Sequence, residues 1–368
     1  MATTKNVMIN GMGVLGRRLL RLIFDNPDLG LTVKRINDWL VTDVSQLAYL
    51  IKYDTVYGRW DKHTVDTGTN ELIIDGDRIQ VTSHSAGSTG QDWHDCDVAI
   101  DCTGSKVWDS GATYAEGYAN FFKTYGGIPY AVGCGNFADN GATLVVFGEN
   151  HTNTAIGETA VRYSALGDMI SATQILNILN SKFRIETAMV DEITAYTNLN
   201  NLEDSAFPAY ASTSQIGRAG AWNIIPTAAT KYKSIVKIRP ELNGKLIGDT
   251  RNVGVITGAL SDFFVNTVDS VGTKEDLLAE LKSAITGGGK EDMLAAYNSG
   301  YPLISFGKNT AGAIVSSDMV GLPYSILDDA VGVTVFSNTF IRVALNYDPI
   351  TLAAANALLT AKYIVENP

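Results

Sequence analysis

The chain has 368 residues, of which 45% are hydrophobic and 18% charged, proportions that are typical of a globular protein and exclude extensive disorder. This length predicts two domains, each large enough to bury a core without disulfide or metal support. The 28 basic and 39 acidic residues give a formal net charge of −11, so neither nucleic acid nor an anionic membrane surface is an expected partner.

No segment approaches the roughly 18 uncharged apolar residues of a membrane span, and the N-terminal residues lack the pattern of a signal peptide. The three cysteines, Cys96, Cys102 and Cys134, are an odd number spread over a long chain, which argues against a secreted disulfide framework. His94 and Asp95 precede Cys96, but this spacing matches no standard zinc site, so we expect buried thiols and no metal. These observations predict a cytoplasmic protein.

The first half of the chain alternates between strand-like and helix-like segments. A short apolar run ends in glycine, apolar residues then recur at helical spacing, and a β-rich segment follows. This order forms a βαβ unit, and its continuation predicts an α/β fold with a mostly parallel sheet that helices cover on both faces. The expected elements are strands at 7–10, 32–36, 97–101 and 143–147 and helices at 14–24 and 108–123.

After about residue 165 the strand-like segments become longer. Longer strands with helices on one side predict a second domain of the α+β class. We find no internal repeat and no low-complexity tract. The expected elements are helices at 169–183, 274–285 and 350–365 and strands at 185–197, 252–256 and 261–268.

The segment Gly11-Met12-Gly13-Val14-Leu15-Gly16 fits the G-x-G-x-x-G motif between a strand and a helix. In this context backbone N–H groups at the helix N-terminus bind a pyrophosphate. Asp38 ends the next strand, where a carboxylate accepts hydrogen bonds from a ribose diol and repels a 2′-phosphate. The motif therefore predicts binding of NAD rather than NADP; the alternative is a glycine-rich turn and a surface carboxylate.

Several motifs resemble the glyceraldehyde-3-phosphate dehydrogenase family. They are Ile9-Asn10-Gly11-Met12-Gly13-Val14-Leu15-Gly16-Arg17, Asn37-Asp38, Lys52-Tyr53-Asp54 with Gly58-Arg59, Asn223-Ile224-Ile225-Pro226, Pro240-Glu241-Leu242-Asn243-Gly244-Lys245-Leu246 and Ser316-Ser317-Asp318. They follow the family's order over nearly the whole chain, with poor correspondence at 61–96, 199–215 and 283–305.

The resemblance implies a Rossmann-type NAD-binding domain at residues 1–165 and 347–368. It also implies an α+β domain of the family's C-terminal type at 166–346, which carries catalysis and the subunit interfaces. The activity it implies is NAD-dependent oxidation of an aldehyde through a cysteine thiohemiacetal, with a histidine as the base.

The two residues for this chemistry are missing. In a gap-free alignment, the family's nucleophilic cysteine falls on Gly167 and its catalytic histidine falls on Thr194. Neither side chain can perform the corresponding role. The resemblance therefore predicts no catalytic residue at either position.

The groups that the family uses to bind phosphate are also replaced. Its Ser-Thr-Gly reads Ala228-Ala229-Thr230, and its arginine falls on Asn252. Arg251 lies one place away, and such an offset in a strand points the side chain to the other face. Asp168 replaces a threonine that would contact the substrate phosphate, so it adds a charge that repels an anion.

A relocated nucleophile is an alternative to loss of the chemistry, and the candidates are Cys134, Cys102 and His151. We expect Cys134 in a loop, Gly133-Cys134-Gly135, that in the family approaches the cofactor rather than the aldehyde. No histidine lies near Cys134 in the sequence, and a thiol without an activating base is mostly inert. A structural thiol is the preferred interpretation.

The chain matches the family's motifs at the adenosine end of the cofactor site but not at the nicotinamide end. The family's Trp-Tyr-Asp-Asn-Glu reads Asn346-Tyr347-Asp348-Pro349-Ile350, so Pro349 replaces the asparagine that would hold the carboxamide. The arginine of the family's Gly-Arg-Ile-Gly turn is Val14. The predicted cofactor-binding residues are Asn10, Gly11, Met12, Gly13, Val14, Leu15, Gly16, Asn37, Asp38, Thr103 and Gly104.

Together these observations predict a catalytically inactive family member that retains binding of NAD or a related adenine nucleotide, or a scaffold role. We treat the losses as independent of one another, and we expect a homo-oligomer, a tetramer or a dimer. Two alternatives remain. One is an NAD-dependent oxidoreductase that acts on an aldehyde with an altered active site, and the other is a structural oligomer whose glycines serve only the turn.

Overall fold

The structure is a computed structural model of the chain. It describes residues 4–41, 43–85, 88, 91–104, 119–135, 144–153, 161–197, 200–205, 217–227, 232–285, 293–300, 302–307, 315–329 and 331–367. The chain forms two compact units. The first comprises residues 1–166, 292–298 and 353–368, and the second comprises residues 167–291 and 299–352.

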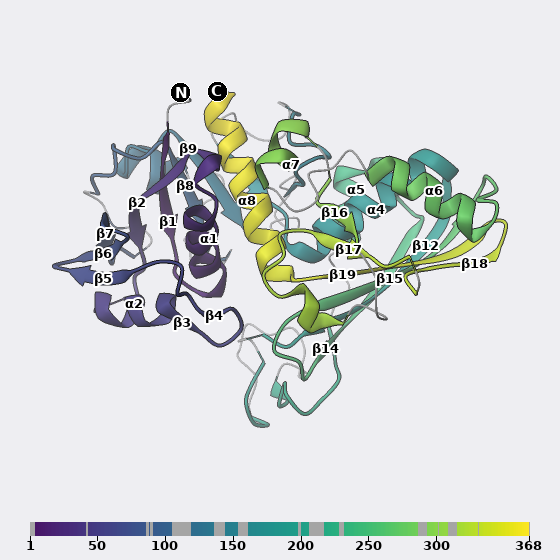
Figure 1. Ribbon diagram of the computed structural model, residues 1–368, viewed down its shortest axis with the longest axis horizontal. Helices are drawn as coiled ribbons and strands as arrows, with labels where there is room; N and C mark the ends of the chain where they lie inside the picture. Colours follow the sequence, from purple (N-terminus) through teal and green to yellow (C-terminus); the bar gives the residue numbers. More distant parts are fainter. Residues whose placement is uncertain are drawn as a thin grey trace. The chain divides into compact units, whose positions relative to one another are not determined.

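The first unit contains a nine-stranded sheet in the order β10-β11-β9-β8-β1-β2-β7-β6-β5 (Figure 1). The strands from β10 to β7 in this order run parallel, whereas β7, β6 and β5 pair antiparallel. The strands are β1 (Lys5–Asn10), β2 (Leu31–Asn37), β5 (Val65–Gly68), β6 (Glu71–Ile74), β7 (Asp77–Thr82), β8 (Val98–Asp101), β9 (Tyr130–Cys134), β10 (Leu144–Val145) and β11 (Val161–Ser164).

The position of β1 between β2 and β8 decides where the first unit has its ligand-binding edge. The chain leaves β1 for α1 and β2 on one side, while β8 pairs with the other side of β1. Such a reversal places the carboxyl ends of adjacent parallel strands around a crevice. Further elements of this part are α1 (Val14–Asp25), η1 (Pro27–Leu29), α2 (Val44–Lys52), β3 (Tyr53–Asp54), β4 (Gly58–Arg59) and a π-helix (Ala119–Tyr125).

The expectation that Cys134 lies in a loop is wrong. Cys134 is the last residue of β9 and is buried, because β9 pairs with β11 through the register Cys134–Ser164. The antiparallel hairpin of β5 and β6 was not predicted, since its short strands carry little apolar alternation. Most of the helix expected at 108–123 lies outside the described residues.

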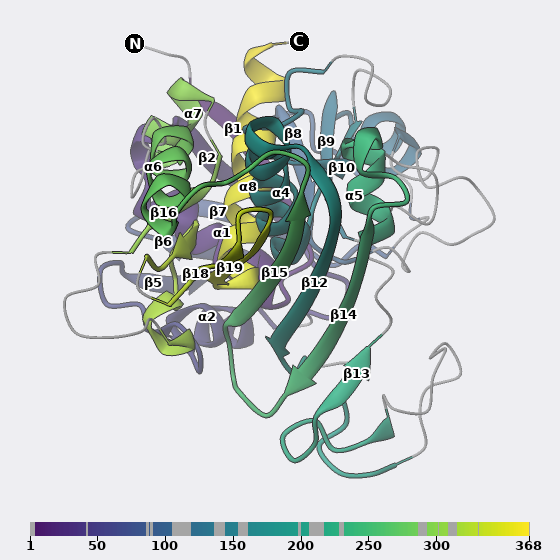
Figure 2. The same ribbon diagram turned by 90° about the vertical axis from the view of Figure 1, so that its right-hand side faces the viewer.

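The second unit contains a sheet in the order β13-β14-β12-β15-β19-β17-β16, with β18 also paired to β19 (Figure 2). The strands are β12 (Ile185–Ala195), β13 (Ile225–Thr227), β14 (Leu246–Val253), β15 (Ala259–Thr267), β16 (Ile304–Phe306), β17 (Ser325–Leu327), β18 (Val333–Ser337) and β19 (Phe340–Tyr347). The remaining helical elements of the chain are α4 (Gly167–Phe183), α5 (Tyr232–Ile238), η6 (Pro240–Leu242), α6 (Lys274–Ile285), α7 (Met293–Ser299), η7 (Ser316–Met319) and α8 (Pro349–Glu366). Most of α7 and most of α8 belong to the first unit.

The strand expected at 252–256 is shifted. The observed strand β14 begins at Leu246 and ends at Val253, because it pairs in parallel with β12 over its whole length. The helices α4, α5 and α6 lie together on one face of this sheet (Figure 1). The α+β character expected for this part of the chain is therefore observed in the second unit.

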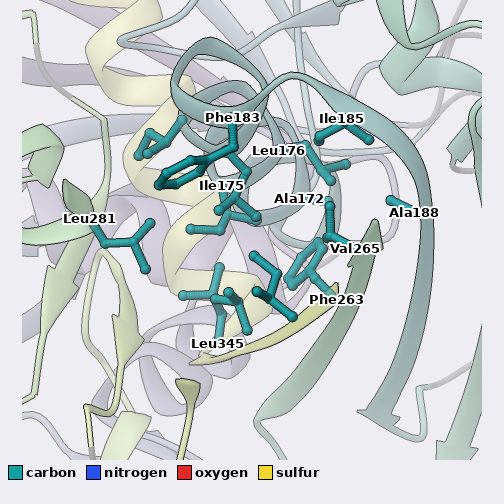
Figure 3. Packing of buried hydrophobic residues seen from close by; sticks show 14 of the residues in the cluster. Ala172, Ile175, Leu176, Phe183, Ile185, Ala188, Phe263, Val265, Leu281 and Leu345 are labelled. Atoms are coloured by element: carbon teal, nitrogen blue, oxygen red, sulfur yellow. The ribbon is translucent and has the colours of Figure 1, made fainter. Parts of the chain in front are cut away.

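Apolar side chains from α4 and from the covered face of the sheet form the core of the second unit (Figure 3). Ile175 and Leu176 of α4 pack with Phe263, Val265 and other buried side chains of the strands. Complete burial of each such side chain contributes about 1.5–3 kcal/mol. Along β12 the covered positions are buried and the intervening ones are mostly exposed, as a strand period of two requires. The core therefore fixes which β12 residues face α4.

Candidate functional site

The glycine motif follows β1 and makes contacts that only glycine allows. Gly11 has a φ of +89°, and its N–H donates to the Asn37 carbonyl over 2.7 Å. A Cβ on Gly16 would lie 2.0 Å from the Gly11 carbonyl oxygen. The first turn of α1 therefore packs directly against the loop, as a dinucleotide-binding turn requires.

Asp38 lies next to this loop, as the sequence predicted. One carboxylate oxygen accepts the Met12 N–H over 2.7 Å and the other accepts the Leu40 N–H over 2.9 Å. A carboxylate oxygen can accept more than one hydrogen bond, so these contacts leave acceptor capacity for a ribose diol. The negative charge of Asp38 is thereby held beside the glycine loop.

A buried polar network joins the ends of β1, β2 and β8. The Asn37 amide donates to the Asn10 side-chain oxygen over 2.8 Å, and the Asn10 amide donates to Asp101 over 2.9 Å. Asp101 also accepts the Thr103 hydroxyl over 2.7 Å. Asp101 was not among the predicted site residues, although an aspartate that ends an apolar strand just before Thr103-Gly104 is a usable signal.

The N-terminus of α1 has space in front of it. No atom of the described residues lies within 4 Å of a Cβ built on Gly13, and Gly13 offers no capping side chain. Val14 is 40% exposed. The first-turn N–H groups and the helix dipole are arranged to bind an anion such as a pyrophosphate. The predicted residues Asn10 to Gly16, Asn37, Asp38, Thr103 and Gly104 thus lie at one edge of the first sheet.

The position that the resemblance assigns to the nucleophile has no room for a side chain. Gly167 is the first residue of α4, and a Cβ on it would lie 2.5 Å from the Pro349 carbonyl oxygen and 2.6 Å from its Cα. Real Cβ atoms essentially never approach backbone this closely, so a cysteine at residue 167 requires Pro349 to move. The side chains that can stand at positions 167 and 349 therefore depend on each other in this structure.

The position assigned to the catalytic base lies beside a buried carboxylate. Thr194 and Glu192 point to the same face of β12, two residues apart. Glu192 is 1% exposed and accepts the Tyr347 hydroxyl over 2.7 Å and the Thr250 hydroxyl over 3.1 Å. Tyr347 also lies 3.0 Å from the Ser261 hydroxyl oxygen.

This polar cluster disfavours a negative charge on Tyr347. Burial raises the pKa of Tyr347 well above its ordinary value, and the nearby charges of Glu192 and Asp168 raise it further. Tyr347 is therefore a neutral phenol, and its hydroxyl donates a hydrogen bond to Glu192. Glu192 was not among the predicted site residues, because a single glutamate in a strand belongs to no motif.

Arg251 lies on the opposite face of the sheet from Thr194. In the register of β12 with β14, Asn252 is paired with Thr194 and Arg251 with Ile193. The Arg251 guanidinium forms ion pairs with Asp191 and Asp249. Residues 228–230, the other position assigned to phosphate binding, lie outside the described residues.

Cys134, Cys102 and His151 do not form an activated nucleophile in the described residues. His151 stacks on Phe147 with ring centroids 4.1 Å apart, and burial lowers its pKa, so it is neutral. The pKa of Cys102 is raised by its hydrogen bond with Cys134 and by burial. Among the described residues, no group of three or more His, Cys, Asp or Glu side chains could hold a metal ion.

Comparisons with known proteins agree with this geometry. Residues 5–107 match the family described as glyceraldehyde 3-phosphate dehydrogenase, NAD binding domain, and residues 170–349 match the C-terminal domain of the same enzyme. The chain is 31% identical over 331 residues to glyceraldehyde-3-phosphate dehydrogenase of Clostridium pasteurianum, covering 88% of this chain and 86% of that protein. It is also 31% identical over 373 residues to the enzyme of Streptococcus pyogenes, covering 98% of each chain.

The chain therefore belongs to the glyceraldehyde-3-phosphate dehydrogenase family. The predicted family, the α/β fold class and the Rossmann-type NAD-binding domain are confirmed. In the part of the chain that the structure describes, no helix is long and apolar enough to cross a bilayer.

Proposed function

We propose that this protein binds NAD through the glycine motif and does not catalyse phosphorylating oxidation of glyceraldehyde 3-phosphate. The observation that carries the proposal is the contrast between two helix N-termini. The start of α1 is open at Gly13, whereas the start of α4 is closed at Gly167 by the backbone of Pro349. In this proposal the first unit is the nucleotide-binding domain and the second unit carries the former catalytic site and the subunit interfaces.

The loss of activity is supported by the chemistry of the replaced groups. Without a thiol at residue 167 the thiohemiacetal cannot form, and loss of a general base alone typically costs about 10²–10⁴ in rate. The charge of Asp168 opposes a substrate phosphate, and Arg251 is engaged by two carboxylates on the other face. We therefore expect turnover at background.

The activity test measures NADH formation from glyceraldehyde 3-phosphate, NAD and inorganic phosphate. It uses the wild type, the double variant Gly167→Cys/Thr194→His and the control Cys134→Ser. We expect background rates from all three, since a cysteine at residue 167 clashes with Pro349 and hydride transfer is not positioned. Wild-type turnover that Cys134→Ser abolishes would instead reveal a relocated nucleophile.

The cofactor test is calorimetry with NAD, NADH, NADP and ADP-ribose. We expect NAD to bind more tightly than NADP, because Asp38 accepts from ribose hydroxyls and repels a 2′-phosphate. We expect ADP-ribose to match NAD, because Pro349 cannot hold the carboxamide. A preference for NADP would contradict the role of Asp38. No heat with any ligand at millimolar concentration would leave a structural oligomer that binds nothing.

We also propose that the protein is a homo-oligomer, a tetramer or a dimer, in the cytoplasm. The support is the face of the second sheet opposite α4. It exposes apolar side chains, among them Met189 at 40%, Ile193 at 41% and Ile247 at 67%. Contiguous apolar groups on a sheet face are typical of a subunit interface. Light scattering that returned the mass of one chain, 39.5 kDa, at micromolar concentration would contradict this proposal.

A second candidate function is an NAD-dependent oxidoreductase with an altered active site. The hydrogen-bonded pair of Tyr347 and Glu192 favours it, because a phenol and a carboxylate can exchange a proton with a substrate. The pair is fully buried, which favours a structural role instead. Aldehyde-dependent oxidation of NADH, abolished by Tyr347→Phe with NAD affinity unchanged, would establish this second function.

A further inference from the structure

Two of the three cysteines lie next to each other at the ligand-binding edge of the first sheet. The strands β8 and β9 pair in parallel through the register Asp101–Gly133, so the following residues, Cys102 and Cys134, are opposite each other. Alternation along the strands places both side chains on the same face. Neighbouring strands lie about 4.8 Å apart, within the Cα separations of about 4.4–6.8 Å that disulfides adopt.

The two thiols are in contact and differ in exposure. Cys102 forms a side-chain hydrogen bond with Cys134. Cys134 is 4% exposed, whereas Cys102 is partly exposed at the end of β8. Burial contributes to the raised pKa of the Cys102 sulfur, yet residue 102 is the more accessible of the two, so an oxidant reaches the Cys102 sulfur before that of Cys134.

Cys102 also packs against the glycine motif. Its N–H donates to the Asn10 carbonyl over 2.7 Å. A Cβ on Gly11 would lie 3.2 Å from the Cys102 carbonyl carbon, and a Cβ on Gly16 would lie 3.6 Å from Cys102 Cβ. A displacement of Cys102 would therefore also displace the glycine loop that binds the nucleotide in the function proposed above.

We propose that Cys102 and Cys134 are a redox modification site, and that a peroxide converts them to a disulfide that weakens nucleotide binding at the adjacent glycine motif. The second part rests on the NAD binding proposed above, whereas the first part does not.

The reaction balances with one peroxide molecule. The Cys102 sulfur attacks one oxygen of hydrogen peroxide, the O–O bond breaks, and water leaves as a sulfenic acid forms on Cys102. The Cys134 sulfur then attacks the Cys102 sulfur, the S–O bond breaks, and the hydroxyl group leaves as a second water with the proton of the Cys134 thiol. The two sulfurs are oxidised and the peroxide is reduced to two water molecules.

The surroundings determine the rate and the reversibility. The raised pKa of Cys102 keeps its thiolate scarce at neutral pH, so the reaction is slow and accelerates with increasing pH. The disulfide would lie at the partly exposed residue Cys102, and exposed disulfides are more readily reduced than buried ones. The pair therefore responds to sustained oxidation and recovers with dithiothreitol.

The test treats the folded protein with hydrogen peroxide, alkylates free thiols after denaturation and identifies the linked peptides by mass spectrometry. We expect a peptide pair that joins Cys102 to Cys134 with a loss of two hydrogen atoms, and an unmodified Cys96. Cys96 is the matched control, because it is also buried and its pKa is raised to about 12, yet it has no neighbouring thiol among the described residues. Cys96→Ser should retain the linkage, and Cys102→Ser or Cys134→Ser should lose it.

Calorimetry with NAD before and after oxidation tests the coupling. We expect about tenfold weaker binding to the oxidised protein, and by linkage NAD should shift the disulfide equilibrium in a dithiothreitol redox buffer by the same factor. A disulfide without any change in NAD affinity would overturn the coupling. Overoxidised Cys102, links between chains, or unreacted thiols would overturn the modification site. Absence of NAD binding to the reduced protein would instead contradict the proposed function and leave the peptide result valid.

Discussion

Two helices of this protein start with a glycine after a strand, but the space around the two glycines differs. Both α1 and α4 follow a strand, and a glycine stands at the start of each helix, Gly13 and Gly167. A Cβ on Gly13 meets no described atom within 4 Å, whereas a Cβ on Gly167 meets the backbone of Pro349 at 2.5 Å. A glycine at the start of a helix can thus leave space for a ligand, as at Gly13, or be required because a side chain has no space, as at Gly167.

The surrounding polar groups differ in the same way. At the first site Asn10, Asn37 and Asp101 satisfy one another beneath the loop and leave the helix start open. At the second site the carboxylate of Glu192 is directed to Tyr347 and Thr250, so the polar groups are engaged within the protein. The comparison contrasts an open helix start at the first site with polar groups that are hydrogen-bonded within the protein at the second.

The largest effect is expected for Gly16→Ala. Its Cβ would lie 2.0 Å from the Gly11 carbonyl oxygen, so the loop must move, with a loss of about 3 kcal/mol in stability and loss of NAD binding. Gly13→Ala is the matched control, because its Cβ enters open space; it should remain folded while its methyl group hinders the pyrophosphate. Urea denaturation and NAD calorimetry check both variants. Equal stability losses for the two would contradict the comparison.

The second largest loss of folding stability is expected for Gly167→Ala. Contact with the Pro349 backbone should destabilise the protein by about 2 kcal/mol, whereas Gly13→Ala, at the N-cap of the other helix, should cost only about 0.5–1 kcal/mol. The measurement is the shift of the urea midpoint at an unchanged slope. If Gly167→Ala and Gly13→Ala were equally mild, the α4 start would have room for a nucleophile after all.

A smaller effect is expected for the buried pair at the second site. Tyr347→Phe removes one buried hydrogen bond to Glu192, at a cost of about 1–3 kcal/mol, and Glu192→Gln weakens the same bond. A double-mutant cycle should therefore give a coupling energy of about 1 kcal/mol. Additive losses, with a coupling energy near zero, would show that the two side chains act separately.

The smallest effect on stability is expected for Asp75, which lies in the turn between β6 and β7 of the first unit. The hydrogen bond from His63 lowers the pKa of Asp75, and the Thr64 N–H contributes as well. Because the folded pKa is depressed, this stabilisation is present above the unfolded value of about 3.9 and is lost as the pH falls through the folded value. Asp75→Asn should therefore lower stability near neutral pH, and the difference from wild type should shrink under acidic conditions.

Denaturation of wild type and Asp75→Asn between acidic and neutral pH measures this difference. NAD affinity of the variant should equal that of the wild type, because Asp75 does not contact the glycine loop. A change in NAD affinity would show that the hairpin and the loop are coupled, and a constant stability difference at all pH values would contradict the ionic character of the contact.

Much of the fold could be predicted from the sequence, since helices with apolar spacing depend mainly on local residues. The helix at 274–285 has the predicted bounds, and α1 and α8 differ from the prediction by a residue or so at their ends. The predictions failed where the pairing between strands determines the bounds of an element. Cys134 belongs to a strand because β11 pairs with it, and β14 is shifted because β12 sets its length.

The sequence by itself determined the glycine motif, the acidic residue after β2, the alternation of strands and helices, and the resemblance to the family. These features are local, or they rest on a resemblance that follows the chain in order. Only the tertiary structure decided that Gly167 packs on Pro349, that Glu192 binds Tyr347, and that Cys102 lies beside Cys134. The register of the strands and the packing of α4 bring these distant residues together, and neither is encoded in the periodicity of any one segment.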